Sequence, residues 1–195
     1  MIDLSTWNLT SPTDPTPQVI TTQQLNNGYQ SQYFQQGNDG GLVFWVPIDG
    51  SHTEDSTYPR TELRETYSNG TLRNWTYPSA ANHTLNATLS IGQVPSSGMI
   101  AISQIHTKLS TSPPVMLGYQ YYPKTGYGDI TLAWRAKPTD ASSKKVVLLK
   151  NVKLGQSFGY TLNLSKTGAL SITTRAPNGT QSKWQGTLAK GWASH

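Results

Sequence analysis

Short strand-like runs recur along this chain, and Gly, Pro, Asn or Ser residues separate them. Examples are GLVFWVPI, TLNATLSIGQV, VMLGYQYY, DITLAWRA, KVVLLKNV and FGYTLNLS. Helical spacing of apolar residues is scarce by comparison. Many short strands with turn residues between them are typical of a β-sandwich or a jelly roll. The pattern therefore predicts an all-β protein.

The length of 195 residues fits a single domain with a sizeable core, so we expect residues 1–195 to form one domain. No run of eighteen apolar residues is present, which argues against a transmembrane helix and a membrane partner. The first residues, MIDLSTWNLT, lack the basic and apolar regions of a signal peptide. We therefore expect either a protein that stays inside the cell or a leader that has been removed.

The composition limits the chemistry. Cysteine is absent, and the four histidines show no short metal-ligand spacing, so we predict no disulfide, no thiolate and no metal site. The formal net charge is +5, and after Glu65 only Asp129 and Asp140 are acidic. This excess of positive charge fits a polyanionic partner such as nucleic acid, anionic lipid or an acidic polysaccharide. It equally fits a basic surface with no such partner.

The segment YPRTELRE, residues 58–65, holds two arginines and two glutamates in a chain with few charges. In a strand, Arg60, Glu62 and Arg64 would share one face, and Leu63 would point to the other. Such a row forms either a surface ladder of ion pairs that stabilises little or a charged binding face.

The segment SQIH, residues 103–106, repeats this pattern. In a strand, Gln104 and His106 would share a polar face, and Ile105 would point away from it. A single histidine on a strand is more often structural or solvated than catalytic. Together, the two segments could form an Arg, Gln, His and Glu surface over a Leu and Ile core.

RTELRE followed by QIH resembles the alginate lyases of polysaccharide lyase family 7, and IDLSTWNLTSP is similar to the family's first strand. The resemblance extends over essentially the whole chain. It implies a β-jelly-roll sandwich of two antiparallel sheets, with a concave groove that binds the substrate. The implied reaction is β-elimination on 1,4-linked uronate chains, which yields unsaturated oligosaccharides.

The resemblance also implies residue roles. Arg60 and Gln104 would neutralise the uronate carboxylate, and His106 would act as the general base. Arg64 and Glu62 would bind substrate or orient Arg60. The family's third motif, Y-F-K-A-G-x-Y-x-Q, has no match, so the expected C-terminal strands and catalytic tyrosine are missing from this sequence. Tyr119 and Tyr121 in GYQYY are candidate substrate-binding residues, but the acid role is not transferred to them.

Three further functions are weighed against the lyase on the sequence. A non-catalytic polyuronate-binding module on the same fold is the main alternative, and the missing tyrosine favours it. A glycoside hydrolase needs two carboxylates that flank the scissile bond, whereas Glu62 and Glu65 would point to opposite faces. Nucleic-acid binding fits the charge but no motif. We expect a monomer that needs no cofactor and acts on an anionic polysaccharide, secreted or periplasmic as the resemblance implies.

Overall fold

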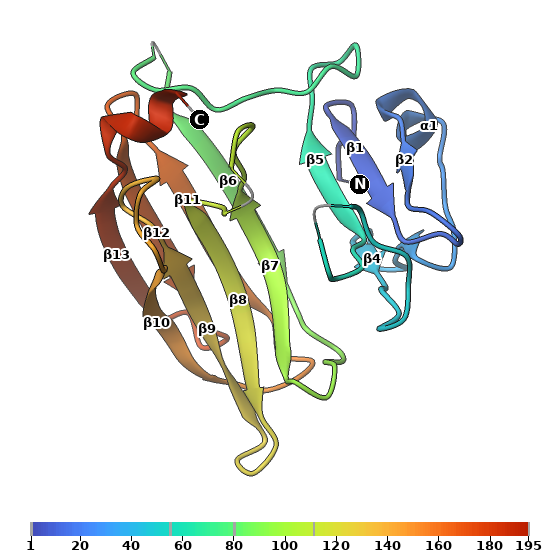
Figure 1. Ribbon diagram of the computed structural model, residues 1–195. Helices are drawn as coiled ribbons and strands as arrows, with labels where there is room; N and C mark the ends of the chain where they lie inside the picture. Colours follow the sequence, from blue (N-terminus) through green and yellow to red (C-terminus); the bar gives the residue numbers. More distant parts are fainter. Residues whose placement is uncertain (1, 55, 80, 111, 195) are drawn as a thin grey trace. The chain divides into compact units, whose positions relative to one another are not determined.

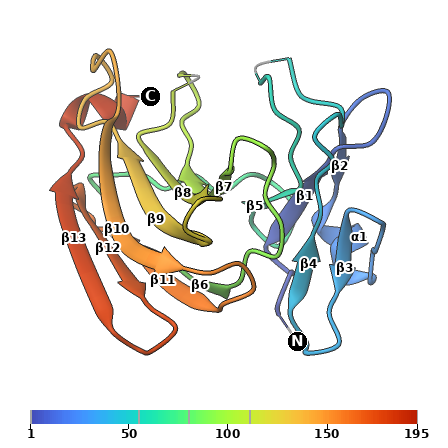
Figure 2. The ribbon, with the colours of Figure 1, turned by 90° about the horizontal axis from the view of Figure 1, so that it is seen from below.

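A computed structural model describes residues 2–54, 56–79, 81–110 and 112–194 (Figures 1 and 2). The chain divides into two compact units, residues 1–74 and residues 75–195. Nearly all of the regular structure in both units is antiparallel strand. The prediction of an all-β protein is therefore confirmed, whereas the assignment of residues 1–195 to a single domain stays a prediction.

The first unit contains a three-stranded sheet, a two-stranded sheet and a short helix. The larger sheet has the order β2 (Gln18–Ile20), β1 (Trp7–Ser11) and β5 (Glu62–Glu65), and the smaller one pairs β3 (Phe34–Gln36) with β4 (Leu42–Phe44). Helix α1 (Thr22–Asn26) begins at Thr21, whose side chain and backbone form a reciprocal capping box with Gln24. The core of the unit consists of four buried side chains, Leu9, Ile20, Leu25 and Phe34.

The second unit contains two four-stranded antiparallel sheets. The front sheet has the order β10 (Lys144–Val152), β9 (Tyr127–Trp134), β8 (Val115–Tyr122) and β7 (Met99–Ile105). The back sheet has the order β13 (Gln181–Thr187), β12 (Ala169–Arg175), β11 (Phe158–Leu164) and β6 (His83–Leu89). A 3-10 helix, η1 (Lys190–Ser194), follows β13.

One apolar core joins the front and back sheets into a sandwich. Its buried residues come from strands of both sheets and include Val115, Leu117, Leu132, Leu162 and Ile172. Strand β11 shows the alternation that produces this core, since Leu162 and Leu164 are buried while the side chains between them lie on the opposite face. Burial of each such aliphatic side chain contributes about 1.5–3 kcal/mol.

A second apolar cluster of this unit contains Tyr119. Its side chain is fully buried, and its hydroxyl donates a hydrogen bond of 2.9 Å to the Val152 carbonyl oxygen of β10. A Cβ atom at Gly128 on the neighbouring strand would lie 2.2 Å from the Tyr119 ring. Glycine is therefore required at position 128 because the ring fills the space where a side chain would stand.

None of the helices in the described parts of the chain is long and apolar enough to cross a membrane.

The Tyr77 side chain links the start of the second unit to its end. It packs in the sandwich core, and its hydroxyl donates a 2.7 Å hydrogen bond to the Ala189 carbonyl oxygen. Burial raises the pKa of the Tyr77 hydroxyl to about 12, because the ionised form loses hydration in the core. In the unfolded chain this pKa is about 10.

We expect Tyr77→Phe to lower the free energy of unfolding at pH 7 by about 1 kcal/mol, through loss of this hydrogen bond. Between about pH 10 and pH 12 the unfolded tyrosine ionises while the folded one stays neutral, so the wild-type protein loses stability as the pH rises. The variant lacks this loss. Urea unfolding at pH 7 and pH 11 should show a smaller difference between the two proteins at pH 11. Tyr58→Phe is the control, because Tyr58 is largely exposed; a constant difference at both pH values would contradict the prediction.

Candidate functional site

Strand β5 separates its charged and apolar residues onto opposite faces. Leu63 pairs with Leu9 of β1 and packs against the core of the first unit. Glu62 and Arg64 pair with Thr10 and Asn8 and therefore point to the other face. The predicted placement of Leu63 opposite the charged residues is confirmed, and the packing of Leu63 against the apolar core explains it.

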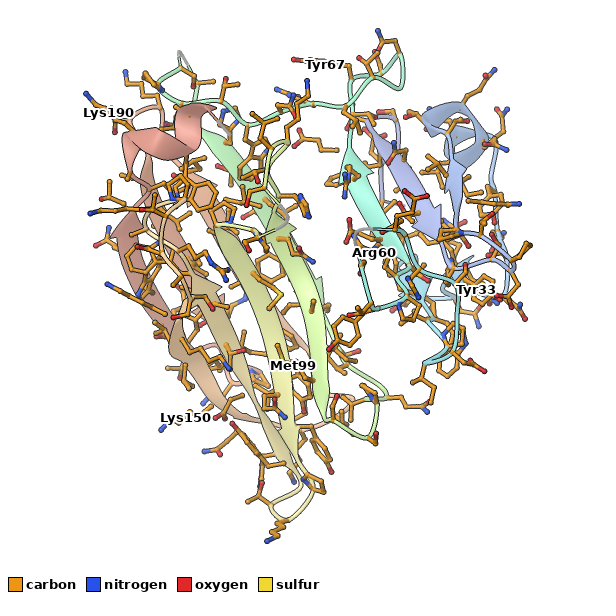
Figure 3. The ribbon with its side chains drawn as sticks, in the orientation of Figure 1. Tyr33, Arg60, Tyr67, Met99, Lys150 and Lys190 are labelled. Carbon is orange, nitrogen blue, oxygen red and sulfur yellow. The ribbon has the colours of Figure 1, made fainter. Side chains whose placement is uncertain are left out.

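Glu62 lies between two arginines. One Glu62 oxygen, Oε1, accepts a 3.2 Å hydrogen bond from Arg64 Nη2, and the other, Oε2, lies 3.8 Å from Arg60 Nη1. Arg60 precedes β5 and is not part of the strand (Figure 3). The Glu62 carboxylate therefore contacts both guanidinium groups. The cluster of Arg60, Glu62 and Arg64 has a net charge of +1. All three side chains are partly exposed, so each guanidinium can present further N–H donors to an anion.

Strand β7 contains a β-bulge that decides which way Gln104 points. Ala101 pairs with Gly118 and Ser103 pairs with Leu117, so Ile102 is an extra residue between them. Without the bulge, a period of two from Ile100 would place Gln104 on the buried face and Ile105 on the outer one. With it, Ile105 pairs with the buried Val115 and packs against the core, and Gln104 points outward.

The structure therefore confirms the predicted inward direction of Ile105. The sequence pattern did not reveal the bulge. Ile100 and Ile102 are spaced as in a regular strand, and continuing that spacing places Gln104, not Ile105, on the core face. The pairing of β7 with β8 is needed to see that one residue is extra.

His106 follows the last residue of β7 and is exposed. Its Nδ1 atom lies 3.0 Å from the carbonyl oxygen of Thr107. A carbonyl oxygen only accepts hydrogen bonds, so this contact places the proton of a neutral imidazole on Nδ1. The Nε2 atom then carries the lone pair and can accept a proton from a substrate.

A row of side chains crosses the outer face of the front sheet from Gln104. Gln104 pairs with Met116, Met116 with Ala133, and Ala133 with Lys145 of β10. Directly paired residues share a face, so the exposed Lys145 lies on the same face as Gln104, three strands or about 14 Å away. Lys145 is not evident from the sequence, because residues so distant along the chain become neighbours in a row only through strand pairing.

Neither tyrosine predicted to bind substrate points to that face. Tyr119 is fully buried and its hydroxyl is bonded to Val152, so the structure corrects its assignment. Tyr121 lies two residues further along β8, shares the inward direction of Tyr119 and packs against the same core cluster. The GYQYY segment thus supplies a core residue at Tyr119 and a partly buried residue packed against the core at Tyr121, and neither points to the face of Gln104.

Metal-assisted chemistry has no obvious ligands here. Within residues 2–54, 56–79, 81–110 and 112–194, no group of three His, Asp or Glu side chains is arranged to hold a metal ion.

Comparison with known proteins shows the family of this chain. The sequence profile of the alginate lyase family matches residues 2–195. An alginate lyase from Klebsiella pneumoniae is 31% identical over 162 residues, which cover 67% of this chain and 52% of that protein. The matched region thus spans about half the length of this relative.

Two solved structures are also similar. The alginate lyase PA1167 from Pseudomonas aeruginosa has a TM-score of 0.89 and 41% identity, with coverage of 99% of this chain and 85% of that one. The alginate lyase A1-II', a member of polysaccharide lyase family 7, has a TM-score of 0.81 and 28% identity, with coverage of 99% and 80%. Their fold agrees with the predicted jelly-roll class. The chain belongs to the alginate lyases of polysaccharide lyase family 7.

Proposed function

We propose that this protein cleaves alginate, a 1,4-linked chain of uronate sugars, by β-elimination. The observation that carries the proposal is the outward Gln104 on β7, close in sequence to His106 just after the strand, in a family member that also holds the Arg60, Glu62 and Arg64 cluster. Each of these side chains offers a group that the reaction needs. Variants of the relative A1-II' are described in complex with an oligosaccharide substrate and with a product, which supports a polyuronate as the ligand.

The reaction removes the C5 proton of a uronate and breaks the bond between C4 and the glycosidic oxygen. The electron pair of the C5–H bond becomes the C4=C5 double bond, and the departing oxygen takes the bonding pair and a proton. The C5 proton is weakly acidic because the adjacent carboxylate already bears a negative charge. Catalysis therefore requires donors that stabilise the extra charge on this carboxylate.

Arg60 and Gln104 are our assignments for that task. A guanidinium can bind both oxygens of a carboxylate through two parallel N–H bonds. The Gln104 amide adds a neutral donor, which stabilises the developing negative charge. Glu62 contacts Arg60 and Arg64, so we assign it to orienting the two guanidinium groups for a substrate carboxylate.

His106 is our assignment for the base. The Thr107 carbonyl favours the tautomer whose lone pair is on Nε2, so a neutral His106 presents a proton acceptor at that atom. Arg64 and Lys145 would bind carboxylates of other sugars in the same chain. Every uronate carries one carboxylate, so each further cation can bind a different sugar of the polymer.

Lyase activity gives a direct test, because the C4=C5 double bond conjugated with the carboxylate absorbs ultraviolet light. We expect absorbance to rise when the protein is mixed with alginate but not with a neutral glucan. Alginate binding should weaken as salt is added, because salt screens exposed charges. Binding without absorbance would instead support a non-catalytic polyuronate-binding module. Equal affinity for both polymers at all salt concentrations would contradict both functions.

We expect His106→Ala to lower kcat by about 10²–10⁴-fold, because general-base catalysis contributes about that much. Alginate affinity and the unfolding midpoint should change little, since the side chain is exposed. His52→Ala is the matched control, because His52 is also exposed and its Nδ1 also lies near the carbonyl oxygen of the next residue, Thr53. Turnover of His106→Ala within a few-fold of wild type would refute the assignment.

We expect Arg60→Lys to lower kcat/KM by about 10–100-fold, although the charge is kept. An ammonium cannot bind both carboxylate oxygens in the planar geometry of a guanidinium, and loss of a charged hydrogen bond costs about 1.5–3 kcal/mol. Arg73→Lys serves for comparison, since Arg73 also pairs with a glutamate, Glu65, at 3.5 Å in the same unit. Initial rates on alginate should separate the two variants, and equal rates would remove Arg60 from the reaction.

A further inference from the structure

The outer face of the back sheet carries polar side chains in regular rows. One row runs Thr84, Asn163, Ser171 and Gln185 across the four strands, and the next runs Asn86, Thr161, Thr173 and Lys183. The side chains that alternate with these rows are buried in the sandwich core on β11 and β12 and pack partly buried against it on β6 and β13. This face is therefore separate from the one that carries Gln104, because the two sheets turn their outer faces in opposite directions.

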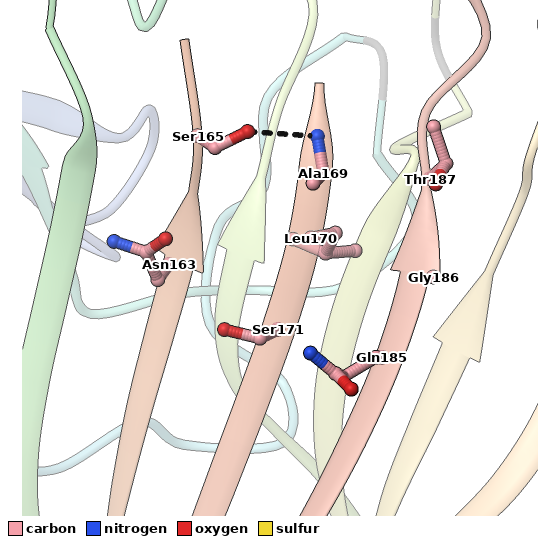
Figure 4. A pocket seen from close by; sticks show the side chains of 8 residues that line it. All are labelled: Asn163, Ser165, Ala169, Leu170, Ser171, Gln185, Gly186 and Thr187. Atoms are coloured by element: carbon pink, nitrogen blue, oxygen red, sulfur yellow. Dashed lines mark hydrogen bonds between the residues drawn. The ribbon is translucent and has the colours of Figure 1, made fainter. Parts of the chain in front are cut away.

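A trough follows β12 on this face. Ala169, Ser171 and Thr173 have short side chains. The longer Asn163 of β11 and Gln185 of β13 stand on either side of Ser171, and Lys183 of β13 stands beside Thr173. An open hollow of about 540 Å³ lies at one end of the trough and is lined by residues that include Asn163, Ser171 and Gln185. Figure 4 shows these three side chains on three neighbouring strands around the hollow.

Hydrogen bonds hold the β11 side of the trough in place. Asn163 Nδ2 donates to Thr84 Oγ1 at 2.7 Å, and Thr161 Oγ1 donates to Asn86 Oδ1 at 2.7 Å. At the upper end, the Ala169 N–H donates to Ser165 Oγ at 3.0 Å (Figure 4). The wall and the end of the trough therefore offer hydroxyl and amide groups in fixed positions, which is the chemistry that sugar hydroxyls require.

Two cations lie toward the other end of the trough. Lys183 is exposed on β13 beside Thr173, and Arg175 ends β12. Arg175 Nη2 donates to Thr88 Oγ1 at 3.3 Å, and a Cβ at Gly159 would lie 2.7 Å from the same nitrogen. Glycine at position 159 thus lets the guanidinium lie against the sheet across β11.

Carboxylates are absent from β6, β11, β12 and β13, all of whose residues are described. Among the described residues, neither Lys183 nor Arg175 takes part in an ion pair. The trough is about 20 Å long. It has neutral hydrogen-bonding groups at one end and uncompensated cations at the other. This arrangement is complementary to a polymer that carries hydroxyls and regularly spaced carboxylates.

We infer that the trough along β12 is a second binding site for a polyuronate chain, separate from the face that carries Gln104. This inference rests on the proposed function for the identity of the polymer. A long alginate chain held in the trough stays near the protein after each cleavage, which raises the effective concentration of its remaining bonds. A short oligosaccharide that occupies one site at a time gains nothing from the trough.

The trough predicts a difference between long and short substrates. In Lys183→Glu, we expect KM for long alginate to rise by about fivefold, because an attractive contact with a carboxylate becomes repulsive. The kcat/KM for a uronate tetrasaccharide should stay within twofold of wild type. Lys124→Glu makes the same charge change at an exposed position of the turn between β8 and β9, and should leave both values unchanged.

A binding experiment tests the site without turnover. In the His106→Ala background, titration calorimetry with the tetrasaccharide should give two sites per chain, and adding Ser171→Trp, which fills the trough floor, should leave one. One site in the parent, or two in the Ser171→Trp protein, would overturn the second site. Duplex DNA that binds as tightly as alginate and is released by Lys183→Glu would overturn it as a sugar site.

The two proposals can fail separately. If alginate is cleaved but Lys183→Glu behaves as wild type on the long polymer, only the trough is refuted. If alginate is neither bound nor cleaved, the proposed function itself is refuted. Ser171→Trp could lose alginate binding because it is less stable, which a lower unfolding midpoint would reveal. Lys183→Glu then decides whether the trough binds alginate, because this substitution lies on the exposed surface.

Discussion

The packing of one face of the core-forming strands against an apolar core is the constraint on which the placement of the polar side chains depends. Leu63 packs against the core of the first unit, so Glu62 and Arg64 point the other way. Leu162 and Leu164 are buried in the second unit, so Thr161 and Asn163 point outward. A one-residue slip in any strand would exchange the two faces, and the cost of exposing the apolar set holds the register.

The bulge at Ile102 shows how this constraint can be met while a polar side chain is redirected. β7 needs Ile100 on the core face at its start and Ile105 on the same face at its end, and a regular strand cannot satisfy both. One extra residue changes the phase, and Gln104 reaches the outer face without loss of apolar burial. Bulges are found beside active sites for this reason.

Electrostatics differ between the two polar faces that we connect with sugar binding. Glu62 lies between Arg60 and Arg64 and fixes their positions, which suits a cluster that must present donors in a defined geometry. Lys183 and Arg175 on the back sheet have no carboxylate on their four strands, which suits retention of a polyanion more than precise orientation. We therefore assign chemistry to the first arrangement and polymer binding to the second.

The sequence by itself determined the fold class, the family and the direction of Leu63, because these follow from local alternation and from motifs of adjacent residues. It also identified RTELRE and QIH as the segments to examine. Only the tertiary structure decided that Tyr119 and Tyr121 belong to the core, that Ile102 shifts the phase of β7, and that Lys145 shares a row with Gln104. Each of these depends on which strand pairs with which and in what register. Pairing is set by contacts between residues far apart in the chain, which no local pattern contains.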